Sequence, residues 1–272
     1  MSSNTATTFW DHLDELRSVL IRIAVVVVVA GGVAFSFKDQ LFSIVFAARN
    51  SDFITYRVFD KISVLINQLL SGEASSVAVQ NIGVENFSIE LINTQLTQQF
   101  TTHISIAMWA GVLVVFPYIL FEIFRFISPA LYSNERRYTS WVVGCGYIMF
   151  ILGVALSYFL IFPLTFRFLA TYQVSSSVAN MIAMESYIGT LITLSLMMGV
   201  VFEMPILCWL FAKLGFLTAD FMRRYRRYAI VILLLISAII TPTADIVTML
   251  LVAMPMYMLY ELSILIVALA RR

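Results

Sequence analysis

The polar segment Phe126-Ile127-Ser128-Pro129-Ala130-Leu131-Tyr132-Ser133-Asn134-Glu135-Arg136-Arg137 separates two long apolar stretches of the chain. Both stretches, at about residues 102–127 and 138–162, are long enough to cross a membrane, because a crossing helix needs about 20 apolar residues. The segment between them carries a proline turn and a single carboxylate. Such a segment is more typical of a docking site than of a spacer.

The composition of the whole chain indicates an integral membrane protein. It is 61% hydrophobic with a mean hydropathy of +0.92, and 12% of its residues are charged, whereas soluble domains carry about 25% charge. A net charge of +1 gives no support for nucleic acid binding. Cys145 and Cys208 lie inside apolar runs without disulfide or metal-ligand spacing. No nucleophile–base pair, phosphate loop or metal constellation is present, so we predict neither an enzyme nor a cofactor.

The apolar pattern predicts an all-α polytopic membrane protein that forms one domain over residues 1–272. Six transmembrane helices are expected at about residues 20–37, 102–127, 138–162, 187–214, 228–240 and 246–268, with a long external loop at about 38–100. The fifth span is short, since its apolar run from Ala229 to Ile240 covers only about 18 Å of a hydrocarbon core of about 30 Å. Either its flanking residues reach toward the interface or the bilayer is thinned there, and we favour thinning.

The basic residues predict the orientation, because Lys and Arg concentrate on the cytoplasmic side of membrane proteins. With a cytoplasmic N-terminus, 12 of the 17 Lys and Arg residues lie inside. The five outside are Lys38, Arg49, Arg57, Lys61 and Arg167. Both termini are therefore expected in the cytoplasm.

Glu203 lies inside the fourth apolar stretch, two residues before Pro205. A centrally placed ionised side chain costs about 2.5 to 3.5 kcal/mol to insert, so a glutamate there usually faces protein or water. We predict a buried polar contact with another helix or a proton-linked site; the alternative is a position nearer the interface. Glu122 and Glu261 lie near span ends, where reaching to the headgroups is an equal alternative.

Glu135 and Glu15 allow two interpretations. An acid in the first turn of a helix is favoured by the helix dipole, so both could simply mark helix starts. Two carboxylates on one side of the membrane, beside the aromatic residues Phe126 and Tyr132, could instead bind a guanidinium group through bidentate hydrogen bonds and cation–π contact.

The pattern of motifs along the chain resembles the TatC family, the multispanning receptor of the twin-arginine protein translocase. The N-terminal half of the match consists of residues 12–17, Phe116-Pro117, Phe121-Glu122 and residues 126–137. The C-terminal half consists of Gly153, Tyr158-Phe159, Pro163, residues 202–205, residues 227–229, Thr241-Pro242, Met254-Pro255 and residues 259–261.

The resemblance implies a function that composition does not show. It implies a signal-peptide receptor and core subunit that exports folded proteins across the bacterial cytoplasmic (inner) membrane on the proton motive force. By motif, Glu15 and Glu135 would be the anionic contacts to the arginine pair. The residues that would shape this site are Arg17, Phe126, Pro129 and Tyr132.

The resemblance also implies partners and an overall shape. Single-span subunits of the TatA/TatB type would dock at the short fifth and sixth helices, other copies of the chain would assemble with it, and the lipid bilayer would surround it. Met249 stands where family members can carry a glutamine of the docking patch, and Thr248 is the nearest polar residue. Glu203 and Pro205 would lie inside a concave bundle. The alternative function is a secondary transporter that uses Glu203 as a proton or cation site.

Overall fold

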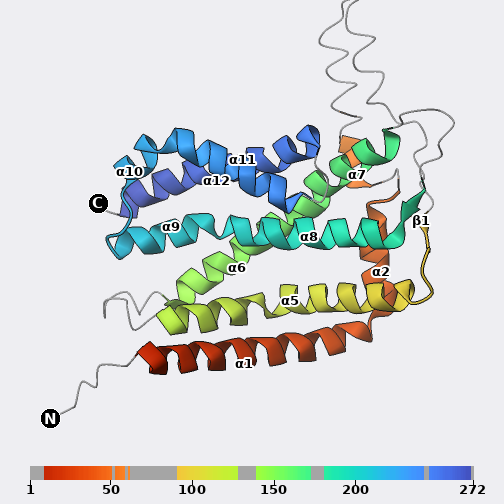
Figure 1. Ribbon diagram of the computed structural model, residues 1–272, viewed down its shortest axis with the longest axis horizontal. Helices are drawn as coiled ribbons and strands as arrows, with labels where there is room; N and C mark the ends of the chain where they lie inside the picture. Colours follow the sequence, from red (N-terminus) through yellow and green to blue (C-terminus); the bar gives the residue numbers. More distant parts are fainter. Residues whose placement is uncertain are drawn as a thin grey trace, which may run out of the picture.

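The computed structural model of the chain is a bundle of long helices (Figure 1). It describes residues 9–50, 53–58, 61, 91–127, 139–172, 181–241 and 245–270. The described helices are α1 (Phe9–Phe35), α2 (Lys38–Ala47), α5 (Gln98–Ile127), α6 (Thr139–Leu156), α7 (Phe162–Thr171), α8 (Met184–Phe202), α9 (Met204–Lys213), α10 (Ala219–Arg224), α11 (Arg226–Ile240) and α12 (Ile246–Ala270).

Five helices within the described ranges are long and apolar enough to cross a membrane, namely Leu13–Phe35, Gln98–Ile127, Trp141–Thr171, Met184–Lys213 and Ile246–Leu269. They coincide with five of the six predicted spans, which confirms a predominantly helical membrane protein. The remaining predicted span corresponds to α11, which has 15 residues. At about 1.5 Å per residue it is about 22 Å long, so it is shorter than the hydrocarbon core of a bilayer.

The two ends of the bundle differ in what they carry (Figure 1). The beginning of α1, the end of α5, α10 and the end of α12 lie at one end, here called the terminal end. α2 and the strands β1 (Leu91–Ile92) and β2 (Ile182–Ala183), which pair in parallel, lie at the opposite end. Among the basic residues predicted to be cytoplasmic, Arg125 lies in the last turn of α5 and Arg223 and Arg224 in the last turn of α10. Lys38, predicted to be external, begins α2 at the opposite end.

Glycines set the closest helix contacts. A Cβ atom on Gly111 of α5 would lie 2.7 Å from the backbone nitrogen of Gly31 in α1, and one on Gly153 of α6 would lie 2.6 Å from the carbonyl oxygen of Met198 in α8. Neither position accepts a side chain without moving a backbone. Small residues allow such close approach between membrane helices, whereas Gly144 faces open space.

The third long helix passes through Pro163 instead of ending there. The π-helical turn η3 (Ser157–Ile161) connects α6 directly to α7, which carries Pro163 in its first turn. Proline has no N–H, so the carbonyl of Phe159 loses its helical donor. The hydroxyl of Thr55, from the segment after α2, donates to this carbonyl instead. The helix reaches Thr171, beyond the end predicted from the apolar run.

Tyrosine hydroxyls bind α2 to the bundle. Tyr158 donates to the carbonyl of Ile44 at 2.6 Å and Tyr187 to the carbonyl of Val45 at 2.9 Å. These carbonyls lie in the last turn of α2, where helical donors are missing. Part of the predicted external loop is thus a helix fixed across the end of the bundle.

Candidate functional site

The predicted signal-peptide residues lie on two different elements of the terminal end. Glu15 and Arg17 are exposed in the first turns of α1, and Phe126 is half-buried in the last turn of α5. Figure 1 shows the beginning of α1 beside the end of α5. The structure therefore places residues from distant parts of the sequence at the same end of the same helix pair. Pro129, Tyr132 and Glu135 lie outside the described residues.

An ion pair joins α1 to α5 next to these residues. Nη2 of Arg22 lies 3.2 Å from Oε2 of Glu122, and the hydroxyl of Tyr118 donates to Oε1 of the same carboxylate at 3.1 Å. Only 2% of Glu122 is exposed. The interpretation that Glu122 reaches to the headgroups is therefore wrong, because the carboxylate has a cationic partner on the neighbouring helix. The sequence signal for this pair was a lone arginine inside the first apolar run.

Glu203 lies at the junction of α8 and α9. Pro205 follows in the first turn of α9 and donates no hydrogen bond to the preceding turn, which separates the two helices at this point. Glu203 is 6% exposed. Its Oε2 would be 3.1 Å from a Cβ atom on Gly146 of α6, so the absence of a side chain there makes room for the carboxylate. Within the described part of the chain, its Oε1 has no hydrogen-bond partner.

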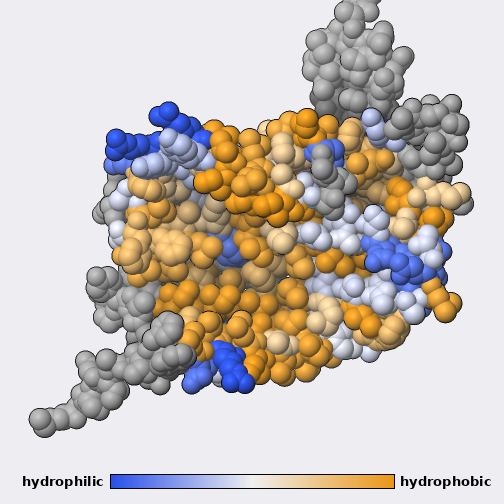
Figure 2. Space-filling model, viewed as in Figure 1, coloured by the Kyte–Doolittle hydropathy of each residue, from blue (hydrophilic) through white to orange (hydrophobic). Residues whose placement is uncertain are grey.

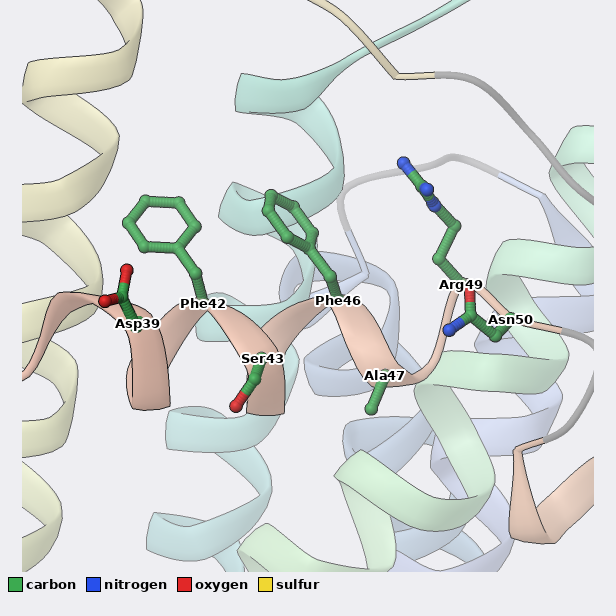
Figure 3. A pocket seen from close by; sticks show the side chains of 7 residues that line it. All are labelled: Asp39, Phe42, Ser43, Phe46, Ala47, Arg49 and Asn50. Atoms are coloured by element: carbon green, nitrogen blue, oxygen red, sulfur yellow. The ribbon is translucent and has the colours of Figure 1, made fainter.

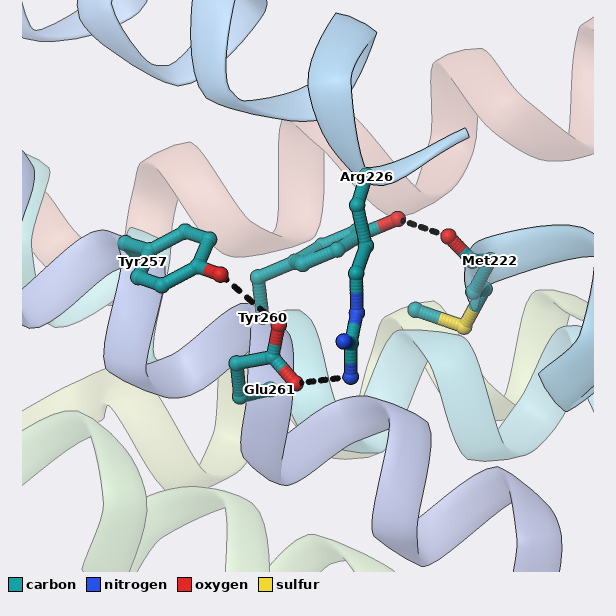
Figure 4. A network of polar contacts seen from close by, with 5 residues as sticks. All are labelled: Met222, Arg226, Tyr257, Tyr260 and Glu261. Atoms are coloured by element: carbon teal, nitrogen blue, oxygen red, sulfur yellow. Dashed lines mark hydrogen bonds and ion pairs between the residues drawn. The ribbon is translucent and has the colours of Figure 1, made fainter. Parts of the chain in front are cut away.

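A polar network holds the corner between α10 and α11 against α12 (Figure 4). Arg226 contacts Oε2 of Glu261 at 2.6 Å, and the hydroxyl of Tyr257 donates to Oε1 at 2.9 Å. The hydroxyl of Tyr260 donates to the carbonyl of Met222 at 2.8 Å. Glu261 is thus paired with an arginine on the neighbouring helix. The sequence had allowed contact with the headgroups as an equal alternative.

The predicted docking residues lie at the start of α12. The hydroxyl of Thr248 donates to Oδ2 of Asp245 at 2.5 Å, and its backbone N–H donates to Oδ1 at 2.7 Å. Thr248 is buried and Met249 is half-buried. Toward the middle of the helix pair, an apolar groove of about 250 Å³ lies between side chains of α11 and α12. Its lining residues are Ile230, Leu233, Leu234, Leu250, Ala253, Met254 and Tyr257.

A more open pocket of about 500 Å³ lies on α2 at the opposite end (Figure 3). Its side chains are Asp39, Phe42, Ser43, Phe46, Ala47, Arg49 and Asn50. Figure 3 shows the rings of Phe42 and Phe46 on one side of α2 and Ser43 on the other. The lining contains no nucleophile–base pair. Among the described residues, no group of three or more His, Cys, Asp or Glu side chains could hold a metal ion.

The surface distributes polarity as a membrane protein does. Figure 2 shows apolar side chains over much of the middle of the visible face and hydrophilic ones gathered over α10 and the start of α11 and at the opposite end. Together with the five long apolar helices, this surface defines a polytopic membrane protein.

Comparison with known proteins gives the family. Residues 11–255 match the family described as Sec-independent protein translocase protein (TatC). The relative in Blattabacterium sp. subsp. Periplaneta americana is 31% identical over 94% of this chain and 93% of its own length. The relative in Deinococcus radiodurans is 32% identical over 94% of this chain and 83% of its own. Both are called Sec-independent protein translocase protein TatC.

Solved structures agree with the sequence match. A crystal structure of the twin arginine translocase receptor TatC superposes with a TM-score of 0.69 at 30% identity, covering 96% of this chain and 100% of that one. A second crystal structure of that receptor, in DDM, gives a TM-score of 0.72 at 29% identity over 93% of this chain and 98% of that one. The chain belongs to the TatC family. It is a membrane component of a protein translocase that works with other Tat subunits, and it is not an enzyme.

Proposed function

We propose that this chain is the signal-peptide receptor and core subunit of a twin-arginine translocase. The observation that carries this proposal is the meeting of the first turns of α1, with Glu15 and Arg17, and the last turn of α5, with Phe126, at the terminal end. The solved relatives of the same fold are described as twin arginine translocase receptors.

The chemistry of this site suits a pair of arginines. A carboxylate binds a guanidinium group through two parallel hydrogen bonds, and an aromatic ring adds attraction to its face. Glu15 and Glu135 would supply the carboxylates. The rings of Phe126 and Tyr132 and the turn at Pro129 would shape the site, with Arg17 beside it. A lysine pair would bind less well, because an ammonium group is a point charge without the planar fork.

The proposal includes the topology and the driving force. Six spans, including the short α11, would place both termini in the cytoplasm of a bacterium, within one domain in its inner membrane. The long helices would form a concave wall that faces Glu203 and Pro205. Folded proteins would cross on the proton motive force. The transporter alternative is set aside because the chain belongs to a translocase family.

We assign the partner surface to α11 and α12. The apolar groove between them, at the level of Leu233, Leu250 and Met254, would accept apolar side chains from a helix of a TatA/TatB-type subunit. Thr248 and Met249 lie beyond one end of this groove, toward the start of α12. Further copies of the chain would complete the assembly.

Site-specific photocrosslinking tests the receptor assignment. A benzophenone-bearing aromatic residue would replace Phe126, and membranes would receive a signal peptide with an Arg-Arg pair or the same peptide with Lys-Lys. We expect crosslinks with Arg-Arg that decrease about tenfold in Glu15→Gln, since a hydrogen bond to a charged group contributes about 1.5 to 3 kcal/mol.

The matched control is Glu185→Gln, which removes an exposed carboxylate from the first turn of α8 at the opposite end. It should leave crosslinking unchanged. Equal crosslinking of both peptides, or an equal decrease in both variants, would contradict the receptor site.

A further inference from the structure

The corner formed by α10 and the first turn of α11 displays a row of exposed aromatic rings. The ring centroids of Phe221 and Tyr225 are 4.5 Å apart, and those of Tyr225 and Tyr228 are 5.9 Å apart. All three side chains are exposed, by 53%, 43% and 57%. Tyrosine and tryptophan rings gather where a membrane protein meets the headgroup region, because they combine an apolar body with a polar O–H or N–H group. The row therefore indicates a surface that contacts the bilayer interface.

The same corner carries a concentrated positive charge. Four arginines occur within five residues, at 223, 224, 226 and 227, and all are exposed. Arg226 is paired with Glu261, and Arg223 lies 3.7 Å from Asp220. Figure 2 shows strongly hydrophilic side chains here, directly beside the apolar band. Arg224 and Arg227 thus add positive charge that the two neighbouring carboxylates do not balance.

The polar network with α12 fixes this surface in place. Met222 is 4% exposed and points into the bundle, and its carbonyl accepts the Tyr260 hydroxyl. The contact between Arg226 and Glu261 holds the start of α11 from the other side (Figure 4). The backbone that carries the outward-facing rings and arginines is therefore held in place, which lowers the entropic cost of binding a ligand.

We propose that this corner binds the headgroup of an anionic phospholipid, a role beyond that of signal-peptide receptor. Arg224 and Arg227 contact the phosphate, since the guanidinium fork matches phosphate oxygens. The rings of Phe221, Tyr225 and Tyr228 lie among the glycerol and upper acyl groups. An acidic protein segment would use the arginines but would leave the rings uncovered, so charge and aromatic exposure together favour the lipid.

Native mass spectrometry of the full chain in mild detergent tests the proposal. The protein would be titrated with dioleoylphosphatidylglycerol and, separately, with zwitterionic dioleoylphosphatidylcholine. A basic residue near an anionic surface contributes a factor of about five to binding. We therefore expect Arg224→Gln/Arg227→Gln to weaken phosphatidylglycerol binding by about 25-fold and to leave phosphatidylcholine binding unchanged.

The matched control is Lys38→Gln/Arg49→Gln, which removes two positive charges at the opposite end. A second variant, Phe221→Ser/Tyr225→Ser, keeps the charges and should weaken binding of both lipids. An unchanged phosphatidylglycerol affinity in Arg224→Gln/Arg227→Gln, or an equal loss in the control, would show that these arginines serve only membrane orientation. A hexaglutamate peptide would be titrated in the same way. If Arg224→Gln/Arg227→Gln lost binding to this peptide but kept its affinity for phosphatidylglycerol, the corner would be assigned to an acidic protein segment instead.

Discussion

The ion pair between Arg22 and Glu122 should give a measurable coupling free energy, and the two single substitutions that break it should destabilise the fold by different amounts. At 3.2 Å the attraction between two unit charges is about 5 kcal/mol in an effective dielectric of about 20. Desolvation of the carboxylate offsets much of this gain. The contact also lacks the bidentate geometry of the strongest pairs, since Nε of Arg22 has no partner in the described part of the chain. We expect a net coupling of about 1 to 2 kcal/mol, similar to the stronger interhelical polar contacts in membranes.

The asymmetry follows from exposure. The side chain of Arg22 is 42% exposed, whereas that of Glu122 is 3% exposed. In Glu122→Met the arginine can turn toward the headgroups. In Arg22→Met the carboxylate stays buried with only the hydroxyl of Tyr118 beside it. Arg22→Met should therefore destabilise the fold by about 2 to 3 kcal/mol, and Glu122→Met by about 1 kcal/mol.

A double-mutant cycle measures both quantities. The two single variants, the double variant and the unchanged protein would be unfolded reversibly in mixed micelles of a mild detergent and dodecyl sulfate. Arg125→Met, which removes an exposed arginine from the same α5, is the control and should shift stability by less than about 0.5 kcal/mol. A coupling below about 0.3 kcal/mol, or Glu122→Met as the more damaging single change, would refute the reasoning.

Three further outcomes follow from other contacts. Gly111→Val should destabilise the α1–α5 pair by about 1 to 3 kcal/mol, because its Cβ would lie 2.7 Å from the nitrogen of Gly31. The control is Gly144→Val, which faces open space and should change stability by less than about 0.5 kcal/mol in the same unfolding assay. The hydroxyl of Tyr56 donates to the carbonyl of Pro163 at 3.1 Å, and burial raises the pKa of Tyr56 to about 12. The stabilising effect of this contact is complete below pH 10 and is lost as pH rises through 12. Tyr56→Phe should therefore lower stability by about 1 kcal/mol at pH 7 and by less above pH 10, and a stability difference that persisted at pH 12 would count against the contact. Glu203→Gln should leave the free energy of unfolding unchanged or raise it by about 1 kcal/mol, because a neutral amide costs less to bury than a carboxylate. A clear decrease in stability would contradict this and would show that the charged carboxylate has a strong partner.

The composition and apolar runs were sufficient to predict the class of protein and the position of most spans. The run at residues 102–127 became α5 (Gln98–Ile127), and the short run at 228–240 became α11 (Arg226–Ile240). The sequence did not show that the third long helix continues through Pro163 to Thr171. At this proline, a hydroxyl from Thr55, which is remote in the sequence, supplies a donor for the carbonyl of Phe159.

For the candidate sites too, the sequence indicated some of the residues and the structure alone showed how they meet. Motif order along the chain nominated Glu15 and Phe126, and the cost of a charge inside an apolar run nominated Glu203. The structure brings the first two to one end of the bundle and buries the third. The lone arginine in the first apolar run offered a cation, but the sequence did not show that Arg22 pairs with Glu122, because that contact depends on how α1 lies against α5.

The sequence by itself therefore determined that this protein spans a membrane as helices, because hydrophobicity adds along the chain and each long apolar run must satisfy its own backbone hydrogen bonds in lipid. The tertiary structure decided which polar side chains meet. Those meetings depend on the rotation and register of neighbouring helices, and close backbone contacts such as Gly111 on Gly31 and Gly153 on Met198 set them. A contact between two helices is a property of both surfaces, so neither run of sequence contains it alone.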